Sequence, residues 1–133
     1  MHQRVLVTDD DPMLRSLYKN IFKNKSGFLS IDFAATKSEA LDCLNKTNYD
    51  FALLDINLGE TEHDGFDILK MINSNFKETK VMMMSSMQPE QVEPTCKLLG
   101  ARGFTPKNRD LIQNLRKWLT LAVAENCFEN RYH

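Results

Sequence analysis

Residues 51–56 of the chain read FALLDI, an apolar run interrupted only by Asp55. A strand without alternating polar residues is typical of a parallel sheet that is covered on both faces. The run therefore predicts a buried central strand that ends near a carboxylate. Residues 4–8 and 81–84 are similar short runs, and residues 29–34 alternate as a half-buried strand does.

Helical patterns lie between the predicted strands. Asp11 followed by Pro12 has the form of a helix cap and a first helical position. Thr36 and Glu39 have the spacing of a capping box, and Asp64 is placed to cap a third helix. The apolar residues expected to line the inner faces of these helices are Met13, Leu14, Leu17, Ile21 and Phe22, then Ala40, Leu41 and Leu44, then Phe66, Ile68, Leu69 and Ile72.

The second half of the chain continues the alternation. Residues 89–99 form the weakest helical pattern because Pro94 lies inside it, which predicts a late start or a kink. Gly100 suits the end of that helix, residues 102–105 can form a fifth strand, and Asn108 can cap a last helix. Five alternations of strand and helix predict a parallel sheet with helices on both faces.

The composition excludes several classes of protein. The chain has 133 residues, 42% of them hydrophobic and 26% charged, which fits one soluble globular domain. A net charge of −1 gives no general attraction to nucleic acid or to anionic lipid, so direct binding to nucleic acid is not expected. The cysteines Cys43, Cys96 and Cys127 lack zinc-site spacing, and no membrane span or signal peptide is visible, so the expected location is the cytoplasm.

The residues that carry chemistry collect at the predicted strand ends. Asp9 and Asp10 follow the first strand, Asp55 ends the third, Ser85 ends the fourth and Lys107 follows the fifth. Ligands bind such sheets beyond the carboxyl ends of the strands. Clustered carboxylates favour a hard cation such as Mg²⁺, and a carboxylate beside it can attack phosphorus. A lysine and a hydroxyl can then orient the phosphoryl oxygens.

Five short segments have a recognisable order and spacing: VLVTDDDP (5–12), LLDINL (53–58), DGF (64–66), MSS (84–86) and GARGFTPK (100–107). Together they resemble the receiver domains of bacterial two-component response regulators, the chemotaxis-regulator-like superfamily. The resemblance implies a flavodoxin-like doubly wound fold, a five-stranded parallel sheet in the order 2-1-3-4-5 flanked by five helices. It places the receiver domain in residues 1–120, and leaves residues 121–133 as an extension of the last helix or a flexible tail.

The resemblance also implies an acceptor and a metal site. Asp55 is the phospho-acceptor in this phosphorelay, and the donor is a sensor histidine kinase or a histidine phosphotransfer protein. Asp10 and Asp55 bind Mg²⁺ directly together with the backbone carbonyl of Asn57, whereas Asp9 acts mainly through water. Such a domain is a phospho-acceptor switch rather than an enzyme that acts on other substrates.

The remaining implied roles concern the switch. Lys107 pairs with Asp55 or with its phosphate, Ser85 hydrogen-bonds the phosphoryl group, and Phe104 is the aromatic switch residue. Output goes to a downstream protein target, and the resemblance allows a homodimer through the face of the fourth and fifth helices. Two features depart from the family pattern: proline precedes the lysine, as Pro106, instead of following it, and residues 59–63 form a longer acidic loop, read here as a tolerated insertion.

Two alternatives compete with the receiver. A phosphatase of the haloacid-dehalogenase type would use Asp9 as nucleophile and Asp11 as the second aspartate, but Met13 stands where that family has a hydroxyl residue. A degenerate receiver would bind partners without phosphorylation. The phosphatase also needs an acidic pair after the lysine, where Asp110 stands alone, and the presence of Asp10, Asp55, Ser85 and Lys107 together argues against the degenerate receiver.

Overall fold

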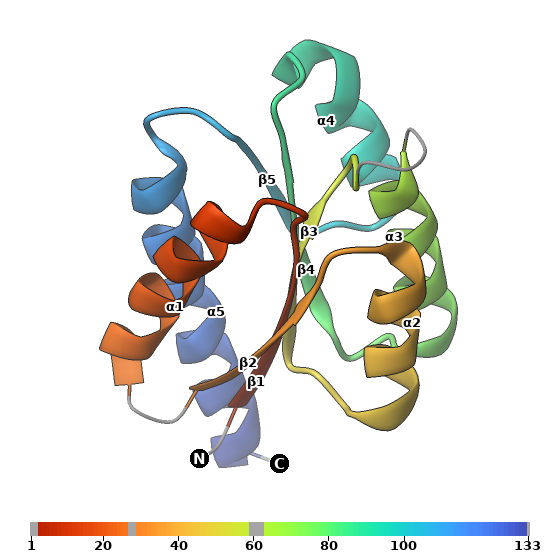
Figure 1. Cartoon of the computed structure of the whole chain (residues 1–133). Helices are drawn as coiled ribbons and strands as arrows, with labels where there is room; N and C mark the ends of the chain where they lie inside the picture. Colours follow the sequence, from red (N-terminus) through yellow and green to blue (C-terminus); the bar gives the residue numbers. More distant parts are fainter. Residues whose placement is uncertain (1–2, 27–28, 59–62, 133) are drawn as a thin grey trace.

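The computed structural model describes residues 3–26, 29–58 and 63–132. Its elements, in chain order, are β1 (Gln3–Thr8), α1 (Pro12–Ser26), β2 (Leu29–Ala34), α2 (Lys37–Lys46), β3 (Phe51–Asp55), α3 (Asp64–Asn75), β4 (Lys80–Ser85), α4 (Pro89–Leu98), β5 (Gly103–Pro106) and α5 (Leu111–Tyr132). The five strands pair in parallel in the order β2-β1-β3-β4-β5, which confirms the predicted doubly wound fold (Figure 1).

Helices cover both faces of the sheet. α1 and α5 lie on one face, and α2, α3 and α4 lie on the other (Figure 1). Each face has its own apolar core, one around Phe22, Leu53 and Leu115, and the other around Leu54, Ile68 and Met83. Every residue of β3 and β4 is buried, as the FALLDI run predicts for a strand between two helical layers.

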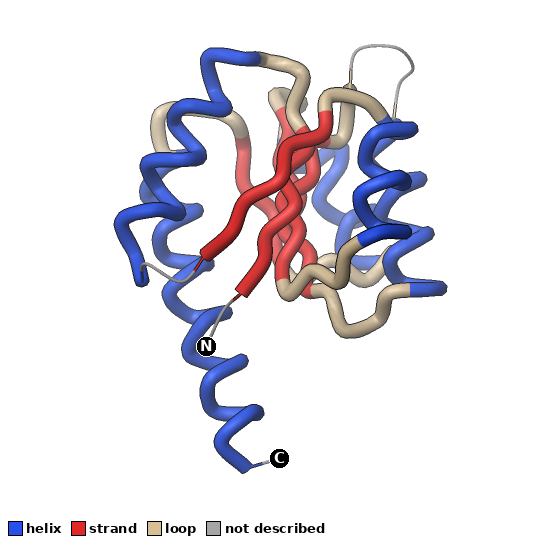
Figure 2. The backbone as a smooth tube through the Cα atoms, turned by 60° about the horizontal axis from the view of Figure 1, so that its bottom comes forward, coloured by secondary structure: helices blue, strands red, loops and turns tan. Residues whose placement is uncertain are grey.

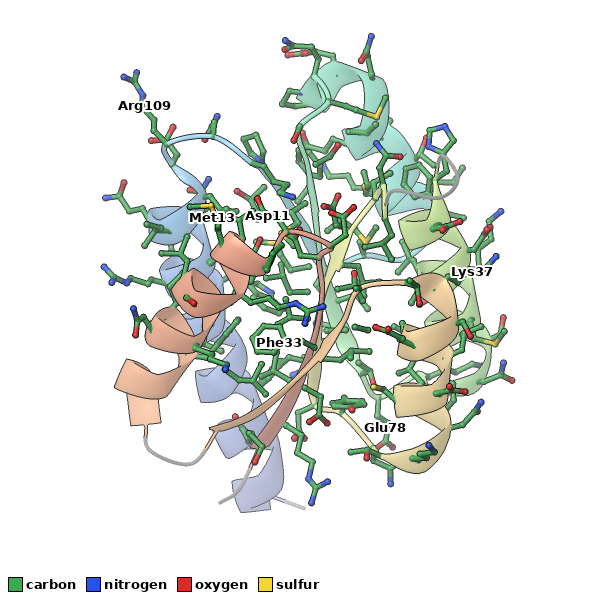
Figure 3. The ribbon with its side chains drawn as sticks, viewed as in Figure 1. Asp11, Met13, Phe33, Lys37, Glu78 and Arg109 are labelled. Atoms are coloured by element: carbon green, nitrogen blue, oxygen red, sulfur yellow. The ribbon has the colours of Figure 1, made fainter. Side chains whose placement is uncertain are left out.

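The inner face of α1 differs from the predicted one at its first turn. Asp11 caps the helix as expected, because its Oδ1 accepts a hydrogen bond from the backbone N–H of Met13 at 2.9 Å. Met13 itself was wrongly placed in the core: its side chain is 82% exposed at the start of α1 (Figure 3). The core contains instead Tyr18, which lies five residues further along α1 and is fully buried.

The starts of α2 and α3 have different caps. Thr36 caps α2 as predicted, since its Oγ1 accepts the backbone N–H of Glu39 at 3.1 Å. The predicted cap of α3 at Asp64 is wrong: the cap is His63, in the left-handed region at φ 70°, and Asp64 is the first helical residue. This tight entry brings the N–H of Gly65 to 2.8 Å from the carbonyl of Ile56.

Of the late start or kink predicted for α4, the late start is wrong. The helix begins at Pro89 and runs through Pro94, although proline cannot donate a hydrogen bond to the preceding turn. Its end is as predicted. Gly100 adopts φ 96°, its N–H donates to the carbonyl of Lys97, and the next N–H donates to that of Cys96, which together form a Schellman motif.

The last helix begins after a short turn. Asn108 accepts the backbone N–H of Asp110 at 2.9 Å through its side chain, and α5 starts at Leu111. The C-terminal part of α5 projects beyond the sheet (Figure 2). Residues 59–62 of the acidic loop lie outside the described residues. Among the helices that are described, none combines the length and apolarity needed to cross a membrane.

Gly65 packs where no side chain fits, which gives a test of this architecture. A Cβ atom at Gly65 would lie 2.2 Å from the carbonyl oxygen of Asp55. We expect Gly65→Ala to lower the free energy of unfolding by about 1–3 kcal/mol, measured by urea denaturation, because backbone has to move. Gly103→Ala is the matched control, since its Cβ would meet the flexible end of Met82. Equal losses in both variants would contradict the tight β3–α3 contact.

Candidate functional site

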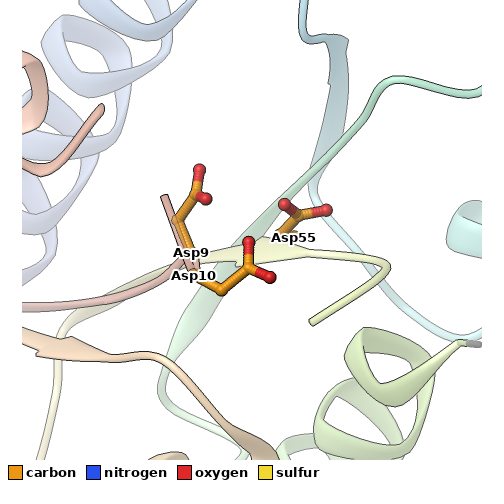
Figure 4. A group of neighbouring side chains, drawn as sticks. All are labelled: Asp9, Asp10 and Asp55. Atoms are coloured by element: carbon orange, nitrogen blue, oxygen red, sulfur yellow. The ribbon is translucent and has the colours of Figure 1, made fainter. Parts of the chain in front are cut away.

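Three carboxylates converge at the carboxyl edge of the sheet (Figure 4). Asp9 and Asp10 directly follow β1, and Asp55 is the last residue of β3, the neighbouring strand. One carboxylate oxygen from each of the three residues lies within 4.8 Å of the others. Asp9 and Asp55 are buried, whereas Asp10 is exposed. The predicted convergence therefore exists, with one of its three carboxylates open to solvent.

Lys107 supplies the positive charge at this edge. Its Nζ lies 2.7 Å from Oδ2 of Asp55 and 3.0 Å from Oδ2 of Asp9, and its side chain is only 13% exposed. The backbone N–H of Lys107 donates to the carbonyl of Ser85 at 2.8 Å, which extends the pairing of β4 with β5. No peptide bond among the described residues is cis, so Lys107 reaches both carboxylates with the trans bond that follows Pro106.

Asp9 is held by three donors. Its Oδ1 accepts the backbone N–H of Asp11 at 3.0 Å, and its Oδ2 accepts the hydroxyl of Tyr18 at 2.7 Å in addition to Lys107. The sequence reasoning missed Tyr18. A tyrosine at helical spacing within the apolar stripe of α1 is the signal that could have identified it, because a buried phenol needs a hydrogen-bond partner.

Asp55 is fixed by its backbone as well as by Lys107. Its N–H donates to Oγ1 of Thr8 on β1 at 3.1 Å, and its Oδ1 accepts the N–H of Asn57 at 3.2 Å. Asn57 in turn accepts the backbone N–H of His63 through its side chain at 3.0 Å. Asp55 is therefore tied to the neighbouring strand through its backbone and to the loop leading to α3 through its carboxylate.

Burial and ion pairing act in opposite directions on these groups. Burial raises the pKa of Asp55, and the ammonium of Lys107 only partly offsets that increase. Burial acts to lower the pKa of Lys107, but the hydrogen bond and charge of Asp55, with those of Asp9, outweigh it and raise that pKa. Burial and the carboxylate of Asp9 likewise raise the pKa of Tyr18, so its hydroxyl stays protonated and donates.

The two predicted switch residues lie in different positions. Ser85 is buried at the end of β4, one residue beyond the pairing of Met84 with Asp55, and its Oγ accepts the N–H of Met87 at 2.9 Å. Phe104 lies further back, on β5, where it is half-buried and packs against the core beneath α2, α3 and α4. The structure thus places Ser85 at the edge of the sheet where the carboxylates lie, whereas Phe104 lies within β5 and contacts the apolar core.

The donor set fits a hard divalent cation. All the candidate ligands are oxygen atoms, and three carboxylates face a single ammonium. Mg²⁺ prefers oxygen ligands, keeps several of its waters, and is commonly held by one or two carboxylates. Asp10 is exposed and Asp55 is buried, so an ion held by both would remain accessible to water on one side.

A family model described as the response regulator receiver domain matches residues 5–118. Among curated proteins, a "Putative transcriptional regulator" of Pseudomonas aeruginosa is 33% identical over 112 residues, which cover 84% of this chain and 53% of that protein. A protein-glutamate methylesterase/protein-glutamine glutaminase of Trichodesmium erythraeum is 26% identical over 93% of this chain and 37% of its own length. The chain spans about half or less of these relatives.

Solved structures share the same fold. A signal receiver domain from Vibrio parahaemolyticus superposes with a TM-score of 0.86 at 22% identity, covering 100% of this chain and 98% of that one. The response regulator protein TrrA from Thermotoga maritima, in complex with Mg²⁺-BeF, gives a TM-score of 0.76 at 23% identity over 90% and 98% of the two chains. With the family model covering nearly the whole sheet, the chain belongs to the response regulator receiver domain family of two-component signalling.

Proposed function

We propose that this receiver domain is a Mg²⁺-dependent switch that accepts a phosphoryl group on Asp55. The observation that carries the proposal is the position of Lys107, whose Nζ lies between Oδ2 of Asp55 and Oδ2 of Asp9. The ammonium beside the acceptor can pair with a phosphoryl oxygen, and the exposed Asp10 leaves an oxygen ligand open towards solvent. Phosphoryl transfer depends chiefly on such positioning and charge.

The proposed metal ligands are those of the predicted site. Asp10, Asp55 and the backbone carbonyl of Asn57 would hold Mg²⁺ directly, and Asp9, whose carboxylate is already occupied by three donors, would act through water. When bound, Mg²⁺ neutralises the negative charge of the carboxylates and of the incoming phosphoryl group. The complex of TrrA with Mg²⁺-BeF supports, by analogy, the presence of a Mg²⁺ site in this fold.

Besides Mg²⁺, the transfer itself needs only residues of this chain and a phosphohistidine donor. A carboxylate oxygen of Asp55 forms the bond to phosphorus, while the P–N bond of the donor breaks and its electron pair returns to the imidazole nitrogen. Lys107, 2.7 Å from Asp55, orients the phosphoryl oxygens. The donor would be a sensor histidine kinase or a histidine phosphotransfer protein.

The proposed output is a change in protein binding. Ser85 would hydrogen-bond the phosphoryl group, and Phe104 on β5 would carry the change towards the face formed by α4, β5 and α5. That face would bind a downstream protein target or form a homodimer. Residues 1–120 would act as the receiver, with residues 121–132 continuing α5, and the domain would work in the cytoplasm.

The contacts of Asp9 and Asp11 do not support the phosphatase alternative. Asp9 is fully buried beneath its three donors, and Asp11 uses Oδ1 to cap α1 rather than facing a substrate. Only a phosphorylation assay distinguishes a degenerate receiver from a working one.

Asp55→Asn tests the acceptor. With Mg²⁺ and acetyl phosphate, we expect the wild type to gain the mass of one phosphoryl group and Asp55→Asn to gain none, because an amide cannot form the acyl phosphate. Intact mass spectrometry measures both. Asp42→Asn, which changes an exposed carboxylate on α2, should be labelled like the wild type.

The labelling has clear contrary outcomes. Labelling of Asp55→Asn together with loss of labelling in Asp9→Asn would support the phosphatase. Absence of labelling from both acetyl phosphate and a phosphohistidine donor would support the degenerate receiver.

Lys107→Gln tests the charge balance. Removing one partner from a buried ion pair leaves uncompensated carboxylates, so we expect a loss of about 3–5 kcal/mol in the free energy of unfolding without Mg²⁺. Lys37→Gln is the control: Lys37 pairs with Asp67 at 3.4 Å on the surface, and its loss should cost less than about 1 kcal/mol. Adding Mg²⁺ should raise the unfolding temperature of Lys107→Gln more than that of the wild type. An equal effect of Mg²⁺ on both would argue against a metal beside Lys107.

A further inference from the structure

Tyr18 reaches from the inner face of α1 into the carboxylate edge. Its side chain is fully buried, and its hydroxyl lies 2.7 Å from Oδ2 of Asp9 and 3.3 Å from Sδ of Met84. A phenol has one proton to donate, and a carboxylate is a much stronger acceptor than a thioether sulfur. The proton is therefore directed at Asp9.

We infer that Tyr18 is a positioning residue that sets the orientation of Asp9 and, through it, the affinity of the site for Mg²⁺. The inference rests on the proposed function. Tyr18 lies outside the acidic cluster of Asp9, Asp10 and Asp55 and contacts it through its neutral hydroxyl group.

The geometry makes Tyr18 suited to this task. The ring is fixed by complete burial, so the hydroxyl is presented from a rigid support. Oδ2 of Asp9 has two side-chain donors, Tyr18 and Lys107, and Lys107 is shared with Asp55 at 2.7 Å. If Lys107 turns towards a phosphoryl group on Asp55, Tyr18 remains as the side-chain donor to Asp9.

A neutral donor has a particular advantage beside a cation site. Tyr18 satisfies a buried carboxylate oxygen without adding a positive charge that would repel Mg²⁺. A phenylalanine of nearly the same shape would leave that oxygen without its phenol donor. Partners that hydrogen-bond metal-binding carboxylates commonly change metal affinity by about 10–100-fold when they are removed.

The test is Tyr18→Phe in the full chain, with Mg²⁺ alone as the probe. Mg²⁺ is titrated by calorimetry and by the shift in thermal unfolding temperature, and the Mg²⁺ dependence of labelling by acetyl phosphate is followed in parallel. We expect the half-saturating Mg²⁺ concentration to rise by about 10-fold in both assays, at the lower end of that range, with Asp55 still the labelled residue.

Tyr49→Phe is the matched control. Tyr49 is also buried, and its hydroxyl donates to a carboxylate, Asp32, at 2.6 Å, but it precedes β3 and so lies at the opposite end of that strand from Asp55. Its loss should leave the Mg²⁺ titration within about 2-fold of the wild type, since it removes the same kind of bond without touching the site.

A double-mutant cycle with Asp9→Asn guards against general loosening of the fold. If Tyr18 acts through Asp9, Tyr18→Phe should cause no further change in half-saturating Mg²⁺ in the Asp9→Asn background. The inference would be overturned, and the proposed function would stand, if Tyr18→Phe had the half-saturating Mg²⁺ concentration of the wild type. Equal shifts of that concentration in Tyr18→Phe and Tyr49→Phe would have the same meaning. A wild type that neither binds Mg²⁺ nor becomes labelled would overturn both.

Discussion

The organisation of the carboxyl edge of the sheet depends on the ion pairs that Lys107 makes with Asp9 and Asp55. Asp9 and Asp55 are both buried, and both direct Oδ2 at the same Nζ, at 3.0 and 2.7 Å. Burying two carboxylates this close together is unfavourable unless a cation lies between them. A buried ion pair is a poor way to stabilise a fold, whereas the two apolar layers on either side of the sheet supply stability. The charges are therefore best explained by the chemistry of the site.

The parallel sheet explains why so much of this site could be predicted from the sequence. Each candidate residue stands at or just beyond the end of an apolar run, and parallel strands end at one edge, so FALLDI with the other runs predicts the meeting of Asp9, Asp55 and Lys107. The order of the strands was implied by the resemblance to receiver domains. The pattern of apolar runs and polar residues does not predict which side chains contact each other. It shows three carboxylates in a group, but not that Asp9 is enclosed by donors while Asp10 faces solvent.

The wrong predictions share a physical cause: tertiary packing overrode local preference. Met13 fits the helical period but lies on the first turn, before α1 meets the sheet, and Tyr18 fills the core because Asp9 satisfies its hydroxyl. Asp64 has the right side chain for a cap, yet the close approach of the α3 backbone to Ile56 makes His63 the cap instead. Pro94 is tolerated in α4 because the helix is anchored at other positions, including the buried Val92.

The backbone also joins the groups that would contact a phosphoryl oxygen. The N–H of Lys107 is bound to the carbonyl of Ser85, so the ammonium and the hydroxyl are carried by one hydrogen-bonded pair of strand ends. Oγ of Ser85 accepts the N–H of Met87 and, being a hydroxyl, still has its own proton to donate. A phosphoryl oxygen that accepts that proton would be linked through Ser85 to the segment that leads into α4. A route from Asp55 to the segment leading into α4 would therefore pass through the hydroxyl group of Ser85, whose hydrogen bond to Met87 is already in place.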